Sequence, residues 1–253
     1  MSRVITRLAD WRALRRSPDW MEHSVGFVPT LGALHAGHVS LLARAREENE
    51  RVVMSVFVNP TQFNDPADLE RYPHTPAADL KRARPYADAI LAPAASEIYP
   101  DDYRYRLTEY SLSQRFEGAY RPGHFEGVLT VILKLLILVQ PQRAYFGEKD
   151  WQQLCLIRGM AEALLLPVDI VGCPTVRDDC GLALSSRNRR LRGEARRRAA
   201  EFPRLLRNSP SATAAATALR DLGFAVDYVE DFEGMRLGAV RLKGVRLIDN
   251  VRL

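Results

Sequence analysis

Cysteine is scarce in this sequence, and no two cysteines have the spacing of a metal-binding or redox motif. The 253 residues include three cysteines, at positions 155, 173 and 180. An odd number without a C-x-x-C pair indicates neither a disulfide framework nor a zinc site. We therefore expect reduced thiols.

Long apolar runs are also missing. The longest extends from Val128 to Val139 and is interrupted by Lys134, whereas a membrane span needs roughly 20 apolar residues. We interpret this run as a buried helix. The N-terminal MSRVITRLADW alternates apolar and basic residues and lacks the continuous apolar core of a secretory signal. These absences predict a cytoplasmic protein.

The charge balance is only mildly basic. The formal net charge is +5, with 47% hydrophobic and 26% charged residues. This composition is typical of a globular chain with one large domain or two unequal ones. The positive charge favours anionic ligands, but it is too small to imply nucleic acid binding without a supporting surface.

Short apolar runs rich in β-branched residues alternate with helical patterns in the first 175 residues. This alternation predicts an α/β fold with a mainly parallel sheet and helices on both faces. Ligands of such sheets bind at the carboxyl ends of the strands. The expected strands are Val25 to Val28, Val52 to Val58, Ala89 to Leu91, Ala144 to Phe146 and Val168 to Val171; the expected helices are His38 to Glu50, Pro76 to Arg84, Phe125 to Val139 and Asp150 to Leu165.

The composition changes near residue 176, where a polar turn and an Arg-rich stretch begin. Strand-like runs follow at Val226 to Val229 and Val245 to Ile248. We predict a larger domain over residues 1–175 and a smaller α+β domain over residues 176–253, a size within the usual range for domains.

A strand, a glycine-containing turn and a helix start occur together in VPTLGALHAGHVSLL. His35 and His38 would stand beside the free N–H groups of that helix, which suits phosphate oxygens. A surface loop with incidental histidines is the alternative. The order of strand, turn and helix favours nucleotide binding.

Three other segments could contribute polar groups. AYFGEKDWQQL places Lys149 at the end of a strand, where it can neutralise a phosphate, although Asp150 is equally explained as a helix cap. LALSSRN, residues 182–188, could close over a triphosphate, although taken alone it reads as a capping arrangement. SVFVNPTQF offers the amides of Asn59 and Gln62, and a β-turn at Asn59-Pro60 is expected in either case.

Taken in order, the segments PTLGALHAGH, FVNPTQF, DLERYP, RPGHFEGVLTVILKLL, YFGEKDWQQL, GLALSSRN and RLIDN resemble the pantothenate synthetase family nearly from end to end. The resemblance implies a Rossmann-like domain with a small C-terminal lid, usually a homodimer, which uses ATP and Mg²⁺. It implies that pantoate and β-alanine are joined through an acyl adenylate to give pantothenate, AMP and pyrophosphate.

The resemblance also implies roles by matching position. His35, His38 and Lys149 would be catalytic and contact phosphates, Gln62, Gln153 and Asn59 would bind pantoate, and Asp79 matches a position associated with Mg²⁺. The residues implied for ATP binding are Leu31, Gly32, Ala33, Leu34, His35, Ala36, Gly37, His38, Gly147, Glu148, Lys149, Asp150, Val176, Leu184, Ser185, Ser186 and Arg187.

The sequence departs from the family pattern at several places. Leu31 and Leu184 stand where Met is usual, a volume-conserving exchange. His74 replaces an arginine, Cys180 replaces an aspartate, and the stretch from Gly238 to Gly244 reads as a shortened strand and loop.

Three alternatives remain open. A nucleotidylyltransferase would share the His-x-Gly-His segment but would retain AMP in its product. An RNA-binding protein is suggested by the arginines between Arg187 and Arg207, although Glu194 and Glu201 interrupt the run and a solvated helix face explains it more simply. A dimer that has lost activity is the third.

Overall fold

The computed structural model describes residues 2–253, and the chain divides into two compact units. The first unit holds the residues up to Leu34 together with His38–Phe146 and Gln153–Cys173. The second unit holds His35–Gly37, Gly147–Gln152 and Pro174–Leu253. The short segments His35–Gly37 and Gly147–Gln152 thus belong with the C-terminal residues, although they come early in the chain.

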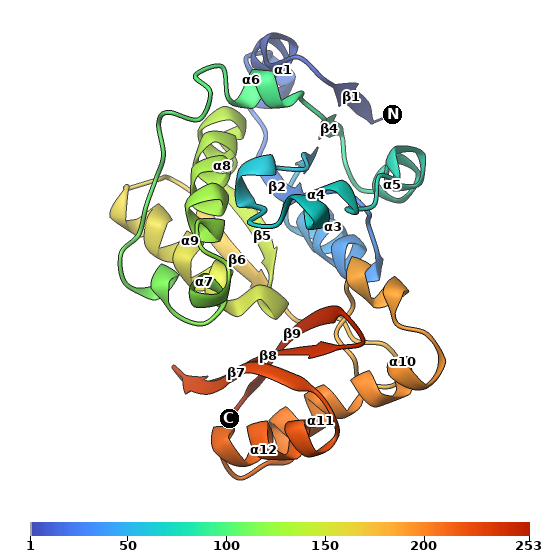
Figure 1. The fold of residues 1–253 in the computed structure, drawn as a ribbon. Coiled ribbons are helices and arrows are strands. Elements are labelled where there is room, and N and C mark those ends of the chain that lie inside the picture. The colour runs from blue at the N-terminus through green and yellow to red at the C-terminus, as the bar shows by residue number, and fades with distance from the viewer. Residues whose placement is uncertain (1) are drawn as a thin grey trace. The chain divides into compact units, whose positions relative to one another are not determined.

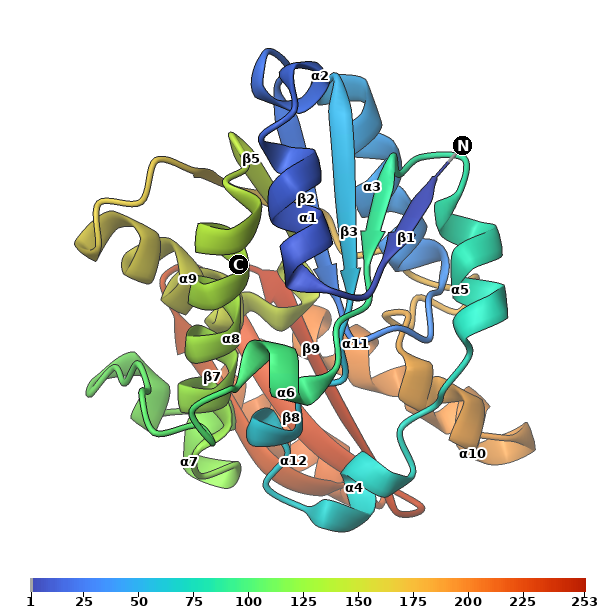
Figure 2. The same ribbon diagram turned by 90° about the horizontal axis from the view of Figure 1, so that it is seen from above.

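A six-stranded parallel sheet forms the first unit, with the strand order β1-β4-β3-β2-β5-β6. Figure 1 shows the strands and Figure 2 shows β2, β3, β4 and β1 side by side. The strand bounds are β1 (Arg3–Ile5), β2 (Val25–Thr30), β3 (Arg51–Val56), β4 (Ala89–Leu91), β5 (Arg143–Gly147) and β6 (Asp169–Cys173).

Helices connect these strands. They are α1 (Leu8–Arg15), α2 (Pro18–Met21), α3 (Ala36–Glu48), α4 (Pro66–Glu70), α5 (Pro76–Ala83), α6 (Ala95–Ile98), α7 (Glu117–Tyr120), α8 (His124–Val139) and α9 (Trp151–Ala163), with 3₁₀ turns η1 (Pro60–Gln62), η2 (Leu112–Gln114) and η3 (Glu148–Asp150). The predicted strands and helices of this region are confirmed with bounds that differ by a few residues.

The central strands β2 and β3 are apolar on both sides because helices cover both faces of the sheet. On one face, Leu41, Leu42 and Ala45 of α3 and Ala83 of α5 pack into a cluster with strand residues. On the other side α1 and α8 are joined by a hydrogen bond from Trp11 Nε1 to the Leu138 carbonyl at 2.9 Å. In Figure 2, α1 lies in front of the strands and α3 behind them.

The apolar run from Val128 to Val139 lies within α8 and is buried over most of its length, as predicted. Every helix among residues 2–253 is too short or too polar to span a bilayer.

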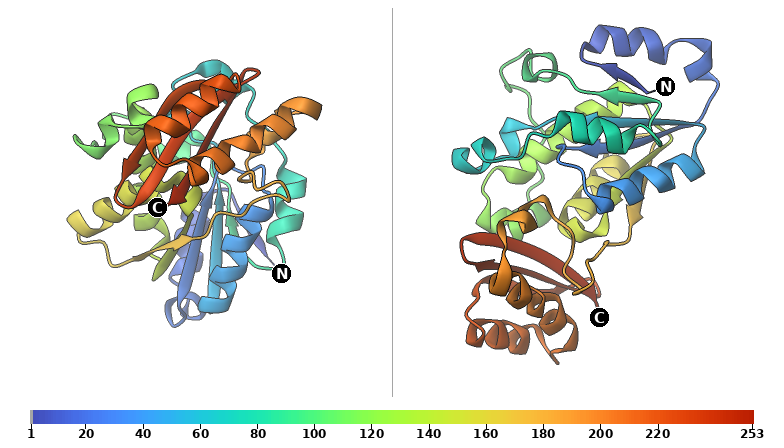
Figure 3. Two further views of the ribbon diagram at one scale, coloured as in Figure 1. Left: turned by 90° about the horizontal axis from the view of Figure 1, so that it is seen from below. Right: turned by 90° about the vertical axis from the view of Figure 1, so that its right-hand side faces the viewer.

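Three antiparallel strands and three helices make up most of the second unit. The sheet order is β7-β8-β9, and Figure 3 shows helices lying along one face of it. Phe202, Leu206 and Leu219 form a core with Val240 and Val251 of the sheet. The bounds are η4 (Ser186–Arg190), α10 (Gly193–Ala199), α11 (Glu201–Asn208), α12 (Ala212–Asp221), β7 (Ala225–Phe232), β8 (Met235–Leu242) and β9 (Val245–Arg252).

Strand β8 is the main element that the sequence reading missed. Gly238 was taken as part of a shortened strand and loop, yet it lies within β8 and pairs with Val229 and Asp249. A Cβ at Gly238 would lie 3.0 Å from both Leu206 and Phe202. The missing side chain therefore lets α11 pack closely on the sheet. The turn after β8 is short, because Lys243 and Gly244 both have positive φ and join β8 to β9 directly.

Candidate functional site

A tight turn follows β2 and leads to the predicted histidines. Gly32 has φ of +82° and Ala33 has φ of +51°. The N–H of Ala33 donates to Asp79 Oδ2 at 2.9 Å, and the N–H of Leu34 donates to Asp79 Oδ1 at 2.8 Å. Ala33 and Leu34 are 1% and 0% exposed. These two predicted ATP residues therefore shape the turn rather than present side chains to solvent.

Asp79 is held in the first turn of α5 and is 2% exposed. Thr75 Oγ1 lies 3.1 Å from Oδ1 and 3.2 Å from Oδ2 of the same carboxylate. We call Asp79, Ala33, Leu34 and Thr75 the Asp79 clasp. Among residues 2–253 there is no group of three His, Cys, Asp or Glu side chains that could hold a metal ion. Because both oxygens of this buried carboxylate already accept hydrogen bonds from the main chain, they do not fit a Mg²⁺ site built around Asp79.

His35 lies at the start of α3. Its Nδ1 accepts the N–H of Gly37 at 3.2 Å, so in the neutral ring the proton is on Nε2, which can donate to a phosphate oxygen. A Cβ at Gly37 would lie 3.0 Å from this ring and 4.0 Å from Cβ of Val176. The N–H of Leu184 donates to the Val176 carbonyl at 2.9 Å. The second unit thus brings together four residues that were predicted to bind ATP: His35, Gly37, Val176 and Leu184. His38 lies in the first turn of α3 and is partly exposed.

Asn59 is buried rather than open to a ligand. It is 0% exposed, its Oδ1 accepts from the Tyr99 hydroxyl at 2.7 Å and the Thr61 hydroxyl at 3.0 Å, and its Nδ2 donates to Gln62 Oε1 and to the Gly127 carbonyl, both at 3.1 Å. All four hydrogen-bonding positions of the amide are used inside the protein. Asn59 therefore orients Gln62 rather than contacting a substrate directly.

Gln62 is fixed by both its side chain and its main chain. Because Oε1 accepts from Asn59, the Nε2 end of the amide is left for a ligand. The main-chain carbonyl accepts from His124 Nδ1 at 2.8 Å. Arg121 Nη1 lies 3.1 Å from His124 Nε2; a guanidinium only donates, so Nε2 accepts and Nδ1 carries the proton.

Sequence reasoning missed the supports of Gln62. Tyr99, His124 and Gly127 are far from Asn59 in the sequence, and RPGHFEGV was recognised only as a family segment. A Cβ at Gly127 would lie 2.5 Å from the Thr61 carbonyl oxygen, so α8 approaches η1 backbone to backbone. Burial raises the pKa of Tyr99 to about 12, which keeps its hydroxyl protonated as a donor to Asn59.

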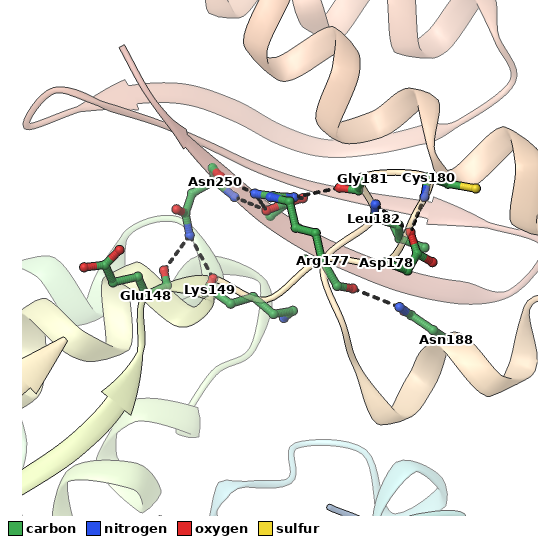
Figure 4. Close-up of polar contacts among 11 residues, drawn as sticks. Glu148, Lys149, Arg177, Asp178, Cys180, Gly181, Leu182, Asn188 and Asn250 are labelled. Atoms are coloured by element: carbon green, nitrogen blue, oxygen red, sulfur yellow. Dashed lines mark hydrogen bonds and ion pairs between the residues drawn. The ribbon is translucent and has the colours of Figure 1, made fainter. Parts of the chain in front are cut away.

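Lys149 and Asp150 lie together in η3, with Nζ of Lys149 3.7 Å from Asp150 Oδ1. Asn250 of β9 supports this segment: its Nδ2 donates to the Glu148 carbonyl at 2.8 Å and to the Lys149 carbonyl at 2.9 Å (Figure 4). We call Asn250, Glu148 and Lys149 the Asn250 clasp. The terminal RLIDN suggested the family, but nothing in the sequence indicated that its Asn250 supports Lys149.

A pocket of about 310 Å³ borders the Asn250 clasp in the second unit. Of the residues predicted to bind ATP, Glu148 lines this pocket. Its lining consists of Glu148, Trp151, Thr175, Arg177, Arg207, Met235, Asn250, Val251 and Arg252.

The turn before LALSSRN is tied to β9 through Arg177. Its guanidinium bonds both oxygens of the buried Asp249 carboxylate, at 2.6 and 2.9 Å. Within the turn, Asp178 Oδ1 accepts the N–H groups of Cys180 and Leu182 at 3.1 and 3.0 Å (Figure 4). The exposed Cys180 side chain is not needed for this turn, although an aspartate was expected there.

The remaining predicted residues take local positions. Ser185 Oγ accepts the N–H of Arg187 at 3.3 Å, so the capping arrangement is present at η4. Gln153 lies in the first turn of α9 and is partly exposed. Of the Arg-rich stretch, Arg196 pairs with Asp178 at 2.8 Å, as expected for a solvated helix face with local ion pairs.

Comparison with known proteins connects this geometry to a family. Residues 3–252 match the family model described as pantoate-beta-alanine ligase. The chain is 50% identical to a pantothenate synthetase of Bdellovibrio bacteriovorus over 254 residues, covering 100% of each chain. It is 48% identical to a pantothenate synthetase of Coxiella burnetii, covering 99% of this chain and 97% of that protein. Against the Bdellovibrio protein, which is covered over its whole length, the C-terminal region is not shortened.

Solved structures agree. A crystal structure of pantoate-beta-alanine ligase from Francisella tularensis, complexed with beta-gamma ATP and beta-alanine, has a TM-score of 0.93 and 36% identity, covering 100% of this chain and 98% of that one. A pantothenate synthetase from Thermus thermophilus has a TM-score of 0.90 and 42% identity, covering 100% and 99%. The chain therefore belongs to the pantoate-beta-alanine ligase family.

Proposed function

We propose that this chain joins pantoate to β-alanine at the expense of ATP, giving pantothenate, AMP and pyrophosphate through a pantoyl adenylate. The match over residues 3–252 supports the ligase reaction. The observation that carries the assignment to a small hydroxy acid is the fixed amide of Gln62. Asn59 holds its Oε1 at 3.1 Å, which leaves Nε2 to donate to a carboxylate or hydroxyl oxygen.

The first half-reaction needs alignment more than proton transfer. A carboxylate with an ordinary pKa near 4 is ionised at neutral pH, so pantoate attacks the α-phosphorus without a general base. The chain must hold the two reactants in line and neutralise charge on the phosphate oxygens. We assign this neutralisation to His35, through Nε2–H, and to His38 and Lys149.

The other substrate groups are assigned by position. Gly147 and Asp150 hold the ribose, Val176 and the segment Leu184 to Arg187 contact the nucleotide, and Gln153 joins Gln62 at pantoate. In the second half-reaction the amine of β-alanine attacks the carbonyl carbon of the adenylate, and the bond to AMP breaks.

Mg²⁺ is proposed as part of the substrate, bound to the ATP phosphates. In proteins Mg²⁺ is commonly held by one or two carboxylates together with substrate phosphates. The donor set around Asp79 does not supply such a site, because the carboxylate is buried and its oxygens accept hydrogen bonds from the protein.

We extend the proposal to a homodimer that works in the cytoplasm. The family resemblance supports the dimer, and the three cysteines, which are thiols rather than disulfides, suit a reducing compartment. Light scattering coupled to gel filtration tests the dimer, and cell fractionation tests the compartment.

The deciding assay measures AMP and pyrophosphate from Mg·ATP with no acid, with pantoate, and with pantoate and β-alanine. We expect sustained turnover to AMP only with both acids, pyrophosphate exchange into ATP with pantoate alone, and loss of both in His38→Ala. AMP retained in a product would favour a nucleotidylyltransferase. RNA binding with no pantoate-dependent turnover would reject the ligase.

A further inference from the structure

We propose that Asp79 is a positioning residue that sets the turn in front of His35 and His38, and that it does not bind metal. This inference rests on the proposed ATP-dependent reaction for its kinetic consequence. Its structural part stands on the contacts of Asp79 alone.

The buried carboxylate has to be stabilised inside the protein. At 2% exposure Asp79 has almost no access to water, and among residues 2–253 no cationic side chain forms an ion pair with it. Its compensation comes from two main-chain N–H groups, one hydroxyl and the N-terminal turn of α5. The carboxylate and the turn of Ala33 and Leu34 therefore depend on each other.

The turn needs such a partner because of its backbone conformation. Ala33 adopts φ of +51°, a left-handed conformation that is unfavourable for a residue with a Cβ. The two N–H groups that Asp79 accepts belong to Ala33 and to the next residue, Leu34. A change at Asp79 releases this turn, and the released chain continues directly into His35 and the start of α3.

The hydrogen bonds also take up most of the acceptor positions that a metal would need. A carboxylate has about four lone-pair positions. Here Oδ1 accepts from Leu34 at 2.8 Å and lies 3.1 Å from Thr75 Oγ1, while Oδ2 accepts from Ala33 at 2.9 Å and lies 3.2 Å from the same hydroxyl. Space is limited as well, since a Cβ on Gly32 would lie 3.1 Å from Oδ2.

The test uses Asp79→Asn, which keeps the size of the side chain. It replaces one carboxylate oxygen by an NH₂ group, so that a donor faces a main-chain N–H that has lost its acceptor. Amide hydrogen exchange, read by NMR at Ala33 and Leu34, reports the turn without ATP. Steady-state kinetics report kcat, the KM values for ATP and β-alanine, and the Mg²⁺ concentration at half-maximal rate.

We expect exchange at Ala33 and Leu34 to become about 10- to 100-fold faster, as for the loss of a buried hydrogen bond. We expect kcat/KM for ATP to fall about 100-fold, because misplaced catalytic groups lose alignment. The KM for β-alanine and the half-maximal Mg²⁺ concentration should stay unchanged. Asp10→Asn, an exposed acid in the first turn of α1, is the matched control and should change none of these values.

Activity restored by added Mg²⁺, with slow exchange at Ala33 and Leu34, would show that Asp79 is a metal ligand and would overturn the inference. Unchanged exchange and kinetics would also overturn it. If Asp79→Asn does not fold, Thr75→Val, which removes only the hydroxyl donor, should give the same pattern with smaller changes. A wild-type chain without turnover would reject the proposed function and leave the exchange test intact.

Discussion

Two buried side chains of opposite hydrogen-bonding character support the backbone beside residues that we propose to contact phosphate. In the first unit a carboxyl acceptor, Asp79, holds the N–H groups of Ala33 and Leu34, which precede His35. In the second unit a neutral donor, Asn250, holds two carbonyl groups at Glu148 and Lys149 (Figure 4). N–H groups need an acceptor and carbonyl groups need a donor, so an aspartate serves the first segment and an asparagine the second.

The comparison teaches where negative charge is tolerated. At the start of α3 the exposed N–H groups and the helix dipole favour an anion. At Glu148 and Lys149 the backbone groups to be satisfied are carbonyl oxygens, which a carboxylate would repel, whereas the amide of Asn250 donates to them. An aspartate and an asparagine are therefore not interchangeable at these two positions.

The largest effect is expected from Asn250→Asp, which replaces the donating amide of the Asn250 clasp by a carboxylate that can only accept. A carboxylate would face two carbonyl oxygens at a site 5% exposed, so the free energy of unfolding should fall by about 3 kcal/mol. Urea denaturation measures this change. Asn208→Asp, at an exposed position in the same unit, is the control; an equal loss in both variants would contradict the clasp.

Asn250→Ala should have a smaller effect, because it removes the donor without adding charge. We expect a loss of about 1 to 2 kcal/mol in unfolding free energy and a fall in kcat with little change in the KM for β-alanine. Denaturation and steady-state assays of the same preparation measure both. If Asn250→Ala is as destabilising as Asn250→Asp, the added negative charge is not the reason for the loss of stability in the aspartate variant.

Tyr99→Phe extends the comparison to a third support, the one behind Gln62. The variant removes the 2.7 Å hydrogen bond to Asn59, worth about 1 kcal/mol, and should raise the KM for pantoate about fivefold while the KM for ATP stays constant. Tyr103→Phe is the control, since its ring packs edge-on against Tyr99 at 5.2 Å without bonding to Asn59. A change in the KM for ATP instead would contradict a local role.

Cys180→Asp should have the smallest effect. The turn already has Asp178 as its acceptor for the N–H groups of Cys180 and Leu182, so the unfolding free energy should change by less than about 0.5 kcal/mol. Thermal unfolding measures it. Asp178→Asn in parallel should be clearly destabilising; a large gain from Cys180→Asp would mean that the turn lacks an acceptor.

Much of the first unit could be predicted because its strands carry a continuous apolar signal. The strand Ala89–Leu91 agrees residue for residue. Strand β1 was missed because three residues with two exposed side chains carry almost no pattern. Strand β8 was missed because Gly238 reads as a breaker in the sequence, whereas Phe202 and Leu206 require it to be small.

The residue types of the site could be recognised in the sequence, but the hydrogen-bonding partners of these residues could not. Histidines, a lysine and amides were recognised at the ends of strands. The sequence placed Asn59 on a substrate and associated Asp79 with a metal, because their partners lie far away along the chain. Tyr99 is 40 residues from Asn59, and Ala33 is 46 residues from Asp79. Only the folded chain shows that these polar groups are already occupied.

The approach of α8 at Gly127 limits how the acid specificity of the chain can be redesigned. With the Thr61 carbonyl oxygen 2.5 Å from any added Cβ, this position cannot be used to enlarge or reduce the space around Gln62. Libraries aimed at bulkier hydroxy acids should therefore leave Gly127 fixed and vary other side chains, such as Gln153, which we propose to bind the acid.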